Sequence, residues 1–138
     1  MQTAKSTVQP PRSNNMSYYV YETRTFEETY KGVPMTLKLT FEEEPLPLED
    51  TFDNDIDNIQ QLYHDIDSGE LVYFCAVMKA YINGVEFGWD SLGACLYKSF
   101  DEFINEDGYF ADMKQCAMEY AYKNAKETCQ MLKESPAW

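Results

Sequence analysis

Two long strand-like segments that meet at Asn83-Gly84 constrain this fold more than any other feature of the sequence. Residues 71–82 and 85–97 are rich in the aromatic and β-branched side chains that favour strands. Asn-Gly readily adopts the two positive φ angles that a two-residue hairpin turn requires. We therefore predict an antiparallel hairpin that pairs Ile82 with Val85, Ala80 with Phe87, Met78 with Trp89 and Phe74 with Gly93.

A second hairpin is predicted before it. Residues 17–30 are rich in Tyr, Thr and Val, and residues 31–34, Lys-Gly-Val-Pro, are typical of a turn. Apolar and polar side chains then alternate over residues 35–41, which indicates a strand with one buried face. That face carries Met35, Leu37, Leu39 and Phe41.

Three further segments have helical patterns. Residues 55–68 place apolar side chains three to four positions apart, and Ser99 with Glu102 forms the Ser-x-x-Glu pattern that caps a short helix ending near Asn105. The longest helix is predicted over residues 109–134. Its apolar stripe contains Met113, Cys116, Ala117, Tyr120, Ala121 and Leu132.

The order ββ-α-ββ-αα predicts an α+β domain. We expect a four-stranded, mostly antiparallel sheet made of two β-hairpins, with about three helices packed on one face. A single acidic domain should cover residues 17–138, because a chain of 138 residues suffices for one sizeable core. Residues 1–16 are polar, so we expect a disordered arm without a secretory signal. No apolar run approaches the about 18 residues that a membrane-spanning helix needs.

The charge is strongly one-sided. The 24 Asp and Glu against 11 Lys and Arg give a formal net charge of −13, which disfavours a protein that binds nucleic-acid phosphates directly. Sixteen of the 24 acids fall in two runs, residues 42–70 and 101–112, that contain no Lys or Arg. If these runs adjoin after folding, they produce one negative face, which we expect to meet a basic surface on another protein.

The candidate partner-binding residues come from these two runs, with two tyrosines as candidate anchors. They are Glu42, Glu43, Glu44, Glu49, Asp50, Asp53, Asp55, Asp57, Tyr63, Asp101, Glu102, Glu106, Asp107 and Tyr109. Two uses of this face stay open: mimicry of the DNA backbone, or docking on a basic patch that binds no nucleic acid. The negative charges on the predicted helix 55–68 are too widely spaced to mimic DNA without the other acidic residues, since duplex DNA carries one charge per about 1.7 Å of axis.

The sequence contains only incomplete patterns for metal binding or catalysis. Residues 53–57, Asp-Asn-Asp-Ile-Asp, begin like a calcium-binding loop, but Asn58 stands where that loop needs Gly and His64 where it needs Glu. His64 is the single histidine, and we expect its side chain to be solvated. We therefore expect no enzyme, cofactor or bound metal. The alternatives are a small metal-dependent enzyme or metal-binding protein that uses the cluster from Asp53 to Asp57, and a structural or assembly subunit, including a homodimer.

The four cysteines, Cys75, Cys95, Cys116 and Cys129, lack the close spacing of a zinc site. We expect small buried side chains in a reducing cytoplasm, with a disulfide as the alternative. The predicted register of the second hairpin puts Cys75 and Cys95 on opposite faces of the sheet, which argues against a bond between them.

No motif identifies a family. In size, charge and predicted architecture, the chain resembles the small acidic proteins of phages and plasmids that inhibit host defence nucleases, including DNA-mimicking anti-restriction and anti-CRISPR proteins. This resemblance implies a non-enzymatic inhibitor or adaptor in the host cytoplasm. Its partner would be the basic surface of a nucleic-acid-processing protein, with no direct contact to nucleic acid or membrane.

Overall fold

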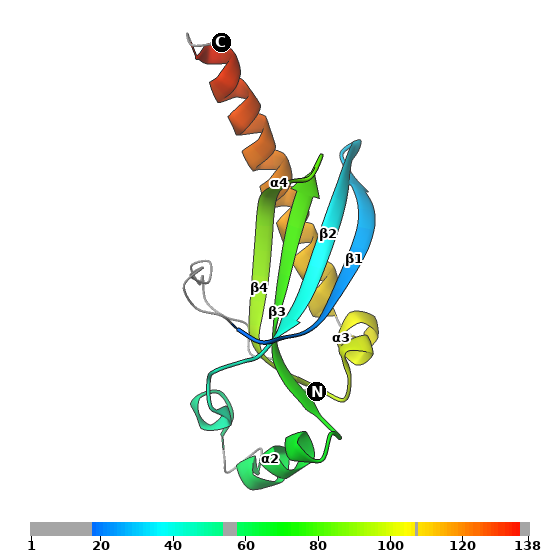
Figure 1. Ribbon diagram of the computed structural model, residues 1–138, viewed down its shortest axis with the longest axis vertical. Helices are drawn as coiled ribbons and strands as arrows, with labels where there is room; N and C mark the ends of the chain where they lie inside the picture. Colours follow the sequence, from blue (N-terminus) through cyan, green and yellow to red (C-terminus); the bar gives the residue numbers. More distant parts are fainter. Residues whose placement is uncertain (1–17, 54–57, 107, 136–138) are drawn as a thin grey trace.

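The computed structural model of the chain describes residues 18–53, 58–106 and 108–135. In chain order its elements are β1 (Val20–Tyr30), β2 (Val33–Glu42), the 3-10 helix η1 (Leu48–Asp50), α2 (Ile59–Asp67), β3 (Val72–Ile82), β4 (Val85–Tyr97), α3 (Phe100–Glu106) and α4 (Gly108–Glu134). The strands form one antiparallel sheet in the order β1-β2-β3-β4 (Figure 1). The predicted α+β class and element order are confirmed. The predicted arm, residues 1–16, lies outside the described residues.

Both hairpins close through two-residue turns with positive φ angles. Lys31 and Gly32 have φ values of 49° and 80°, and Asn83 and Gly84 have values of 51° and 80°. Such turns match the right-handed twist of the flanking strands. Lys31 is an unusual residue for this conformation, and its ammonium group lies 5.2 Å from the ring centre of Tyr122, a contact that offsets part of the backbone cost.

The predicted register of the second hairpin is right only beside the turn. Ile82 faces Val85, but the register shifts between Ala80 and Tyr81 and again between Phe74 and Ala76. Ala80 therefore faces Gly88 instead of Phe87, Met78 faces Asp90 instead of Trp89, and Phe74 faces Cys95 instead of Gly93. Each shift is a β-bulge with one extra residue on β4, and a turn sets the register only as far as the first bulge.

Packing against α4 explains the first bulge. A Cβ atom on Gly88 would lie 2.3 Å from the carbonyl oxygen of Ala117 and 2.6 Å from the amide nitrogen of Ala121. A side chain therefore does not fit at this position, and the bulge puts Gly88 there in place of Phe87. The carbonyl oxygen of Phe87, the extra residue, accepts a hydrogen bond from Asn124 Nδ2 of α4 at 2.8 Å.

The main core lies between the sheet and the two C-terminal helices. α4 crosses one face of the sheet and continues past the strands, and α3 precedes it near one end of β1 (Figure 1). The four apolar residues of β2 that alternation predicted are all buried in this core. The helices contribute Phe103, Phe110, Met113, Ala117, Met118 and Ala121.

The apolar stripe of α4 is narrower and shorter than predicted. Cys116 and Tyr120 are exposed, and the buried residues Met113, Ala117, Met118 and Ala121 form the face of α4 that meets the sheet. Leu132 is also exposed, and it belongs to the last turns of α4, which extend beyond the strands (Figure 1).

A second, smaller core lies on the other face of the sheet. It joins Leu48 of η1, Phe52, Ile59 of α2 and Leu96 of β4. Leu96 alternates along β4 with Cys95 and Tyr97, which belong to the main core, so the two cores lie on opposite faces. The prediction that all helices share one face is therefore wrong for α2.

The start of α2 also differs from the prediction. The helix begins at Ile59 instead of residue 55, because Asn58 has a left-handed backbone with φ of 50°. The Asn58 side chain caps the helix by accepting a hydrogen bond from Gln61 N–H at 3.3 Å.

All four cysteines are free thiols. Cys75 and Cys95 are buried on opposite faces of the sheet, as predicted, since Cys95 lies in the main core and Cys75 alternates with core residues of β3. Cys116 and Cys129 are exposed on α4, so the prediction of four buried cysteines is wrong for these two. Within the described residues, the helices lack the combination of length and hydropathy needed to cross a membrane.

Candidate functional site

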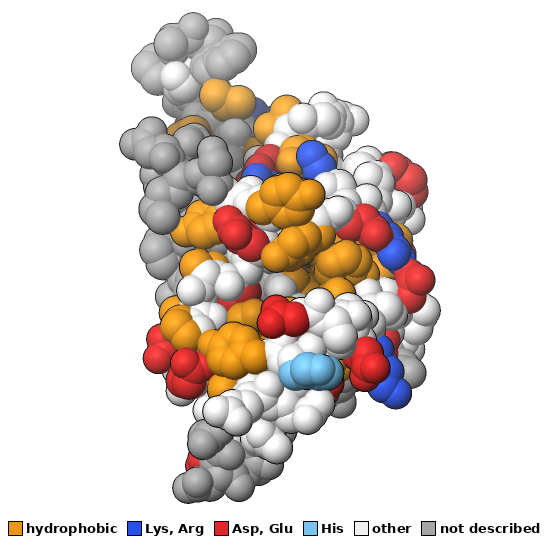
Figure 2. Space-filling model, turned by 60° about the horizontal axis from the view of Figure 1, so that its bottom comes forward, with side chains coloured by type: hydrophobic (Ala, Val, Ile, Leu, Met, Phe, Trp, Pro, Cys, Tyr) orange, Lys and Arg blue, Asp and Glu red, His pale blue; other side chains and the backbone are white. Residues whose placement is uncertain are grey.

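The candidate site is one end of the molecule, formed by the loop after β2, η1, α2 and the starts of β1 and α3, which we call the acidic end. Its described carboxylates from the first run are Glu42, Glu43, Glu44, Glu49, Asp50, Asp53, Asp65, Asp67 and Glu70. Figure 2 shows acidic side chains across this end with hydrophobic side chains between them, and Lys and Arg toward the upper and right margins. The carboxylates therefore share this surface with apolar groups.

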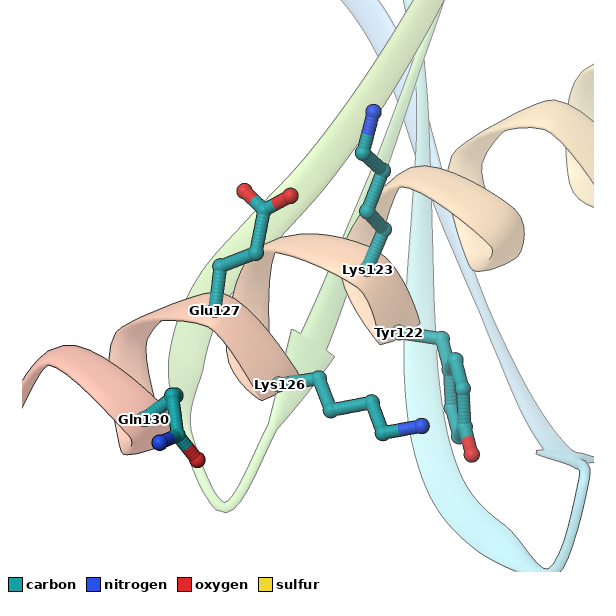
Figure 3. A pocket seen from close by; sticks show the side chains of 5 residues that line it. All are labelled: Tyr122, Lys123, Lys126, Glu127 and Gln130. Atoms are coloured by element: carbon teal, nitrogen blue, oxygen red, sulfur yellow. The ribbon is translucent and has the colours of Figure 1, made fainter. Parts of the chain in front are cut away.

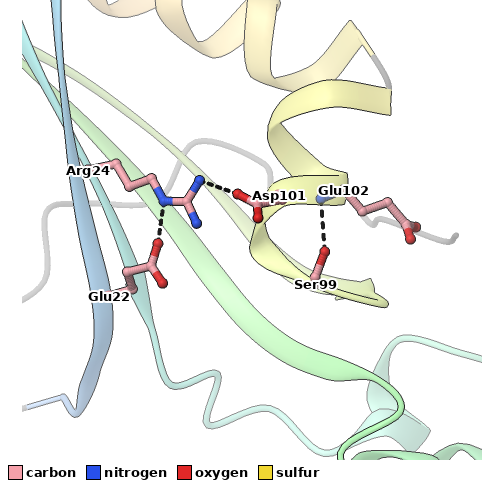
Figure 4. Close-up of polar contacts among 5 residues, drawn as sticks. All are labelled: Glu22, Arg24, Ser99, Asp101 and Glu102. Carbon is pink, nitrogen blue, oxygen red and sulfur yellow. Dashed lines mark hydrogen bonds and ion pairs between the residues drawn. The ribbon is translucent and has the colours of Figure 1, made fainter.

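The two acidic runs approach each other where β1 and α3 begin. Val20 pairs with Glu42 across the sheet, and the ring of Tyr21 stacks on that of Phe100 with centres 6.2 Å apart. Arg24 forms ion pairs with both Glu22 and Asp101 at this junction (Figure 4). Part of the negative charge between the runs is therefore neutralised within the chain.

The presence of acidic residues at positions 101 and 102 is explained by their place at the start of α3. Ser99 Oγ accepts a hydrogen bond from Glu102 N–H at 3.1 Å, as the capping pattern predicts (Figure 4). Both carboxylates lie in the first turn, where the positive end of the helix dipole favours them. The Glu102 side chain points away from Arg24 (Figure 4).

Glu44 supports the second bulge of β4. Its Oε1 accepts a hydrogen bond from Ala94 N–H at 2.6 Å, and its Oε2 accepts one from Leu46 N–H at 3.3 Å. Ala94 is a buried bulge residue with φ of 53°, and the carboxylate supplies the acceptor that its amide needs. Glu44 is therefore committed to the fold of the acidic end.

Tyr73 packs beside Glu44. Its hydroxyl donates a hydrogen bond to the carbonyl oxygen of Leu46 at 2.9 Å. Burial raises the pKa of Tyr73 to about 12, with a further increase from the negative charge of Glu44, whereas a hydrogen bond with the Thr51 side chain lowers it. The phenol is therefore neutral at physiological pH and acts as a donor.

Tyr63 links α2 to η1. Its hydroxyl donates to Glu49 Oε1 at 2.5 Å and accepts from Leu48 N–H at 3.3 Å. The hydrogen bond with Glu49 raises the pKa of Tyr63. The side chain is 40% exposed, so Tyr63 stays a candidate anchor with a carboxylate beside it.

Further exposed apolar residues lie at this end, in addition to those predicted from the sequence. Tyr19 is 65% exposed and Tyr21 is 48% exposed, and Val20 and Leu46 are also exposed. The run Tyr-Tyr-Val-Tyr over residues 18–21 breaks the alternation expected of a half-buried strand. That break is the signal that could have identified them.

Other predicted site residues do not contribute to the described surface. Tyr109 is half-buried and packs against the main core, so its prediction as an exposed anchor is wrong. Glu106 ends α3, and its side chain is outside the description, as are the whole of Asp55, Asp57 and Asp107. His64 is exposed, as expected, with Nδ1 3.6 Å from Asp65 Oδ1.

A metal site and a cavity are the other features that could indicate a functional site. Among residues 18–53, 58–106 and 108–135, no three His, Cys, Asp or Glu side chains come together as a metal site, and the cluster from Asp53 to Asp57 is represented there by Asp53 alone. A cavity of about 430 Å³ lies along α4, lined by Tyr122, Lys123, Lys126, Glu127 and Gln130 (Figure 3). All five residues come from one face of α4 and their side chains spread apart, so the cavity is an open depression (Figure 3).

The fold and the site define a small α+β protein in which a long helix packs on an antiparallel four-stranded sheet and one end combines carboxylates with exposed aromatic rings. No family model, curated protein or solved structure matches the chain. Its function is therefore inferred from its own residues and their geometry.

Proposed function

We propose that this protein is a non-enzymatic inhibitor or adaptor that binds a basic surface of a nucleic-acid-processing protein through its acidic end. The observation that supports this most strongly is that exposed Tyr19, Tyr21, Leu46 and Tyr63 share one end with several carboxylates, among them Glu43, Glu49 and Asp50. Apolar anchors inside a polar rim are the usual anatomy of a protein interface, and carboxylates select a cationic partner. Action in the cytoplasm against a host defence nuclease is part of this proposal.

The excess of negative charge also supports a cationic partner. Among the described residues, no ion pair joins Glu43, Glu44, Glu49 or Asp50 to a Lys or Arg. Repulsion among such charges costs stability, and a basic surface relieves it. Association should therefore weaken as salt screens the attraction.

Docking on a basic patch fits the acidic end better than mimicry of duplex DNA. Mimicry needs outward-facing charges at intervals of about 1.7 Å along an axis. The nine residues of α2 span about 14 Å and carry Asp65 and Asp67. Elsewhere, Glu44 and Glu49 accept hydrogen bonds from within the chain, and Asp101 pairs with Arg24.

A charge-reversal experiment with a matched control tests the proposal. The test variant carries Asp50→Lys, Asp53→Lys and Asp67→Lys at the acidic end. The control variant carries Glu119→Lys, Glu127→Lys and Glu134→Lys on α4. All six side chains are exposed, and three reversals of two charges each change the formal net charge from −13 to −7 in both variants.

Each protein is immobilised and exposed at low salt to a lysate of the native host cell, and proteins eluted by a salt gradient are identified by mass spectrometry. We expect the wild type and the control variant to retain the same basic nucleic-acid-binding protein. The test variant should retain at least about tenfold less of that protein. Circular dichroism verifies that both variants are folded. Equal retention by a folded test variant would contradict the proposal.

A second candidate function is assembly by self-association, which α4 favours. Its last turns extend beyond the sheet, and Met131 and Leu132 are exposed there (Figure 1). Sizing chromatography at two protein concentrations measures this. Earlier elution at the higher concentration, lost on Met131→Ser and Leu132→Ser, would support assembly, whereas constant elution as a monomer would contradict it.

A further inference from the structure

The exposed rings at the start of β1 are connected to the main core by a row of aromatic contacts. Phe41 is fully buried, and its ring stacks on that of Phe100 with centres 4.3 Å apart. Phe100 stacks on Tyr21, and Tyr21 makes an edge contact with Tyr19 at 5.2 Å. The row holds the outer rings in place before any partner arrives, which lowers the entropy cost of binding.

A carboxylate lies beside the exposed end of this row. Tyr19 N–H donates a hydrogen bond to Glu43 Oε1 at 3.2 Å, and Glu43 N–H donates one to the carbonyl oxygen of Tyr19 at 2.8 Å. Partial burial raises the pKa of Tyr21, and the nearby charge of Glu43 adds to the increase. A carboxylate has about four acceptor positions, so Glu43 keeps the capacity to bind a further donor.

We propose that Tyr19, Tyr21 and Glu43 form a receptor for an arginine side chain of the partner protein, an inference that rests on the proposed function. A guanidinium group is planar, stacks on aromatic rings and donates two parallel hydrogen bonds to one carboxylate. A lysine ammonium group is a compact, strongly hydrated point charge without that geometry. The acidic end therefore prefers arginine over lysine at equal peptide charge.

The same pairing of ring and carboxylate recurs at Tyr63 and Glu49. The exposed ring of Tyr63 belongs to α2, and its hydroxyl is bonded to the Glu49 carboxylate of η1. A partner segment with several arginines therefore finds two ring–carboxylate pairs at this end of the molecule. This repetition favours an arginine-rich surface over a single arginine.

Two defined peptides test the receptor. Both have the same length and glycine spacing, and one carries three arginines where the other carries three lysines. Dissociation constants are measured by calorimetry at low salt for the wild type, Tyr19→Ala, Tyr19→Phe and Tyr120→Ala. Tyr120 is a matched control, since its ring is 59% exposed on α4, away from the aromatic row.

We expect the wild type to bind the arginine peptide about fivefold more tightly than the lysine peptide. Tyr19→Ala should lower that preference to about twofold, because the pair of Tyr63 and Glu49 remains, and should leave the affinity for the lysine peptide unchanged. Tyr19→Phe and Tyr120→Ala should keep the full preference. Equal affinities in the wild type, or a preference that Tyr19→Ala does not weaken, would overturn the receptor and leave the proposed function standing. Binding of neither peptide would overturn the receptor and count against the proposed function as well.

Discussion

The two faces of the sheet are stabilised in different ways. On the face covered by α4, a continuous apolar core packs so closely that Gly88 has no space for a side chain. On the other face, the small core around Leu48 and Leu96 covers one end only. Hydrogen bonds to the backbone supplement it: Glu44 and Tyr63 accept them, and Tyr73 donates one. Buried apolar packing is therefore concentrated on the α4 face, and the carboxylates that we propose bind a partner are concentrated where the core is small.

This difference separates carboxylates of the acidic end that accept hydrogen bonds within the fold from those that we propose bind a partner. Glu44 accepts hydrogen bonds from two backbone amides, one of them on a buried strand residue. Asp50 is exposed in η1 and forms no ion pair with a Lys or Arg among the described residues. Removing the first should affect folding, and removing the second should affect association with a partner.

The largest effect on stability is expected on the α4 face. Gly88→Ala places a Cβ atom against the backbone of Ala117 and Ala121, and the overpacking should lower the free energy of unfolding by about 3 kcal/mol. Gly108→Ala is the matched control, because a Cβ atom there meets nothing within 4 Å. Urea denaturation measures both. A loss for Gly88→Ala as small as that for Gly108→Ala would show that the sheet and α4 do not pack so closely.

A smaller and more local effect is expected in the second core. Leu48→Ala should lower the free energy of unfolding by about 2 kcal/mol, because Leu48 is fully buried but lies near the surface of a small cluster that can partly collapse. Amide hydrogen exchange should accelerate in η1 and α2 and stay unchanged in α4. The exposed Leu46 provides the control Leu46→Ala. Uniform acceleration through α4 would mean that the two cores unfold together.

The role of Glu44 in the fold predicts a third effect. Glu44→Ala leaves the buried amide of Ala94 without its acceptor and should lower the free energy of unfolding by about 1.5 kcal/mol. Asp50→Ala should change it by less than about 0.5 kcal/mol. Thermal denaturation compares the two variants. Equal losses would contradict the division of the acidic end into structural and partner-binding carboxylates.

The smallest effect concerns alkaline pH. The pKa of Tyr73 is about 12 in the folded protein, whereas the pKa of a tyrosine in an unfolded chain is about 10. As the pH rises through this interval the unfolded chain loses the proton first, so the free energy of unfolding falls. Tyr73→Phe should make stability less dependent on pH there. Parallel stability curves for the wild type and Tyr73→Phe would show that burial does not shift this tyrosine.

Prediction from the sequence succeeded where neighbouring residues decide the structure. Asn83-Gly84 forms the expected turn, the alternating residues of β2 are buried, and Ser99 caps α3. It failed where distant elements meet. The register changes because Gly88 meets α4, and η1 and α2 pack at one end of the sheet, on the side away from α4, because Leu96 points there.

The candidate site shows the same division. The acidic runs were evident from the sequence, but the pairing of Arg24 with Asp101 joins β1 to α3, and the bond between Glu44 and Ala94 joins a loop to β4. Which carboxylates are used inside the fold thus depended on contacts between elements. The exposure of Tyr19 and Tyr21 is indicated in the sequence only by the break in the alternation of apolar and polar residues over residues 18–21.

The two hairpins, the long helix α4 and the excess of negative charge could be predicted from the amino-acid order alone. Turn preference and side-chain periodicity act between close neighbours, and net charge depends on composition only. The register beyond the first bulge, the side of the sheet on which α2 packs and the carboxylates that stay available to a partner followed from the packed fold. These depend on close packing and on hydrogen bonds between segments far apart in the chain, where several partners are chemically acceptable and only the packed geometry selects one.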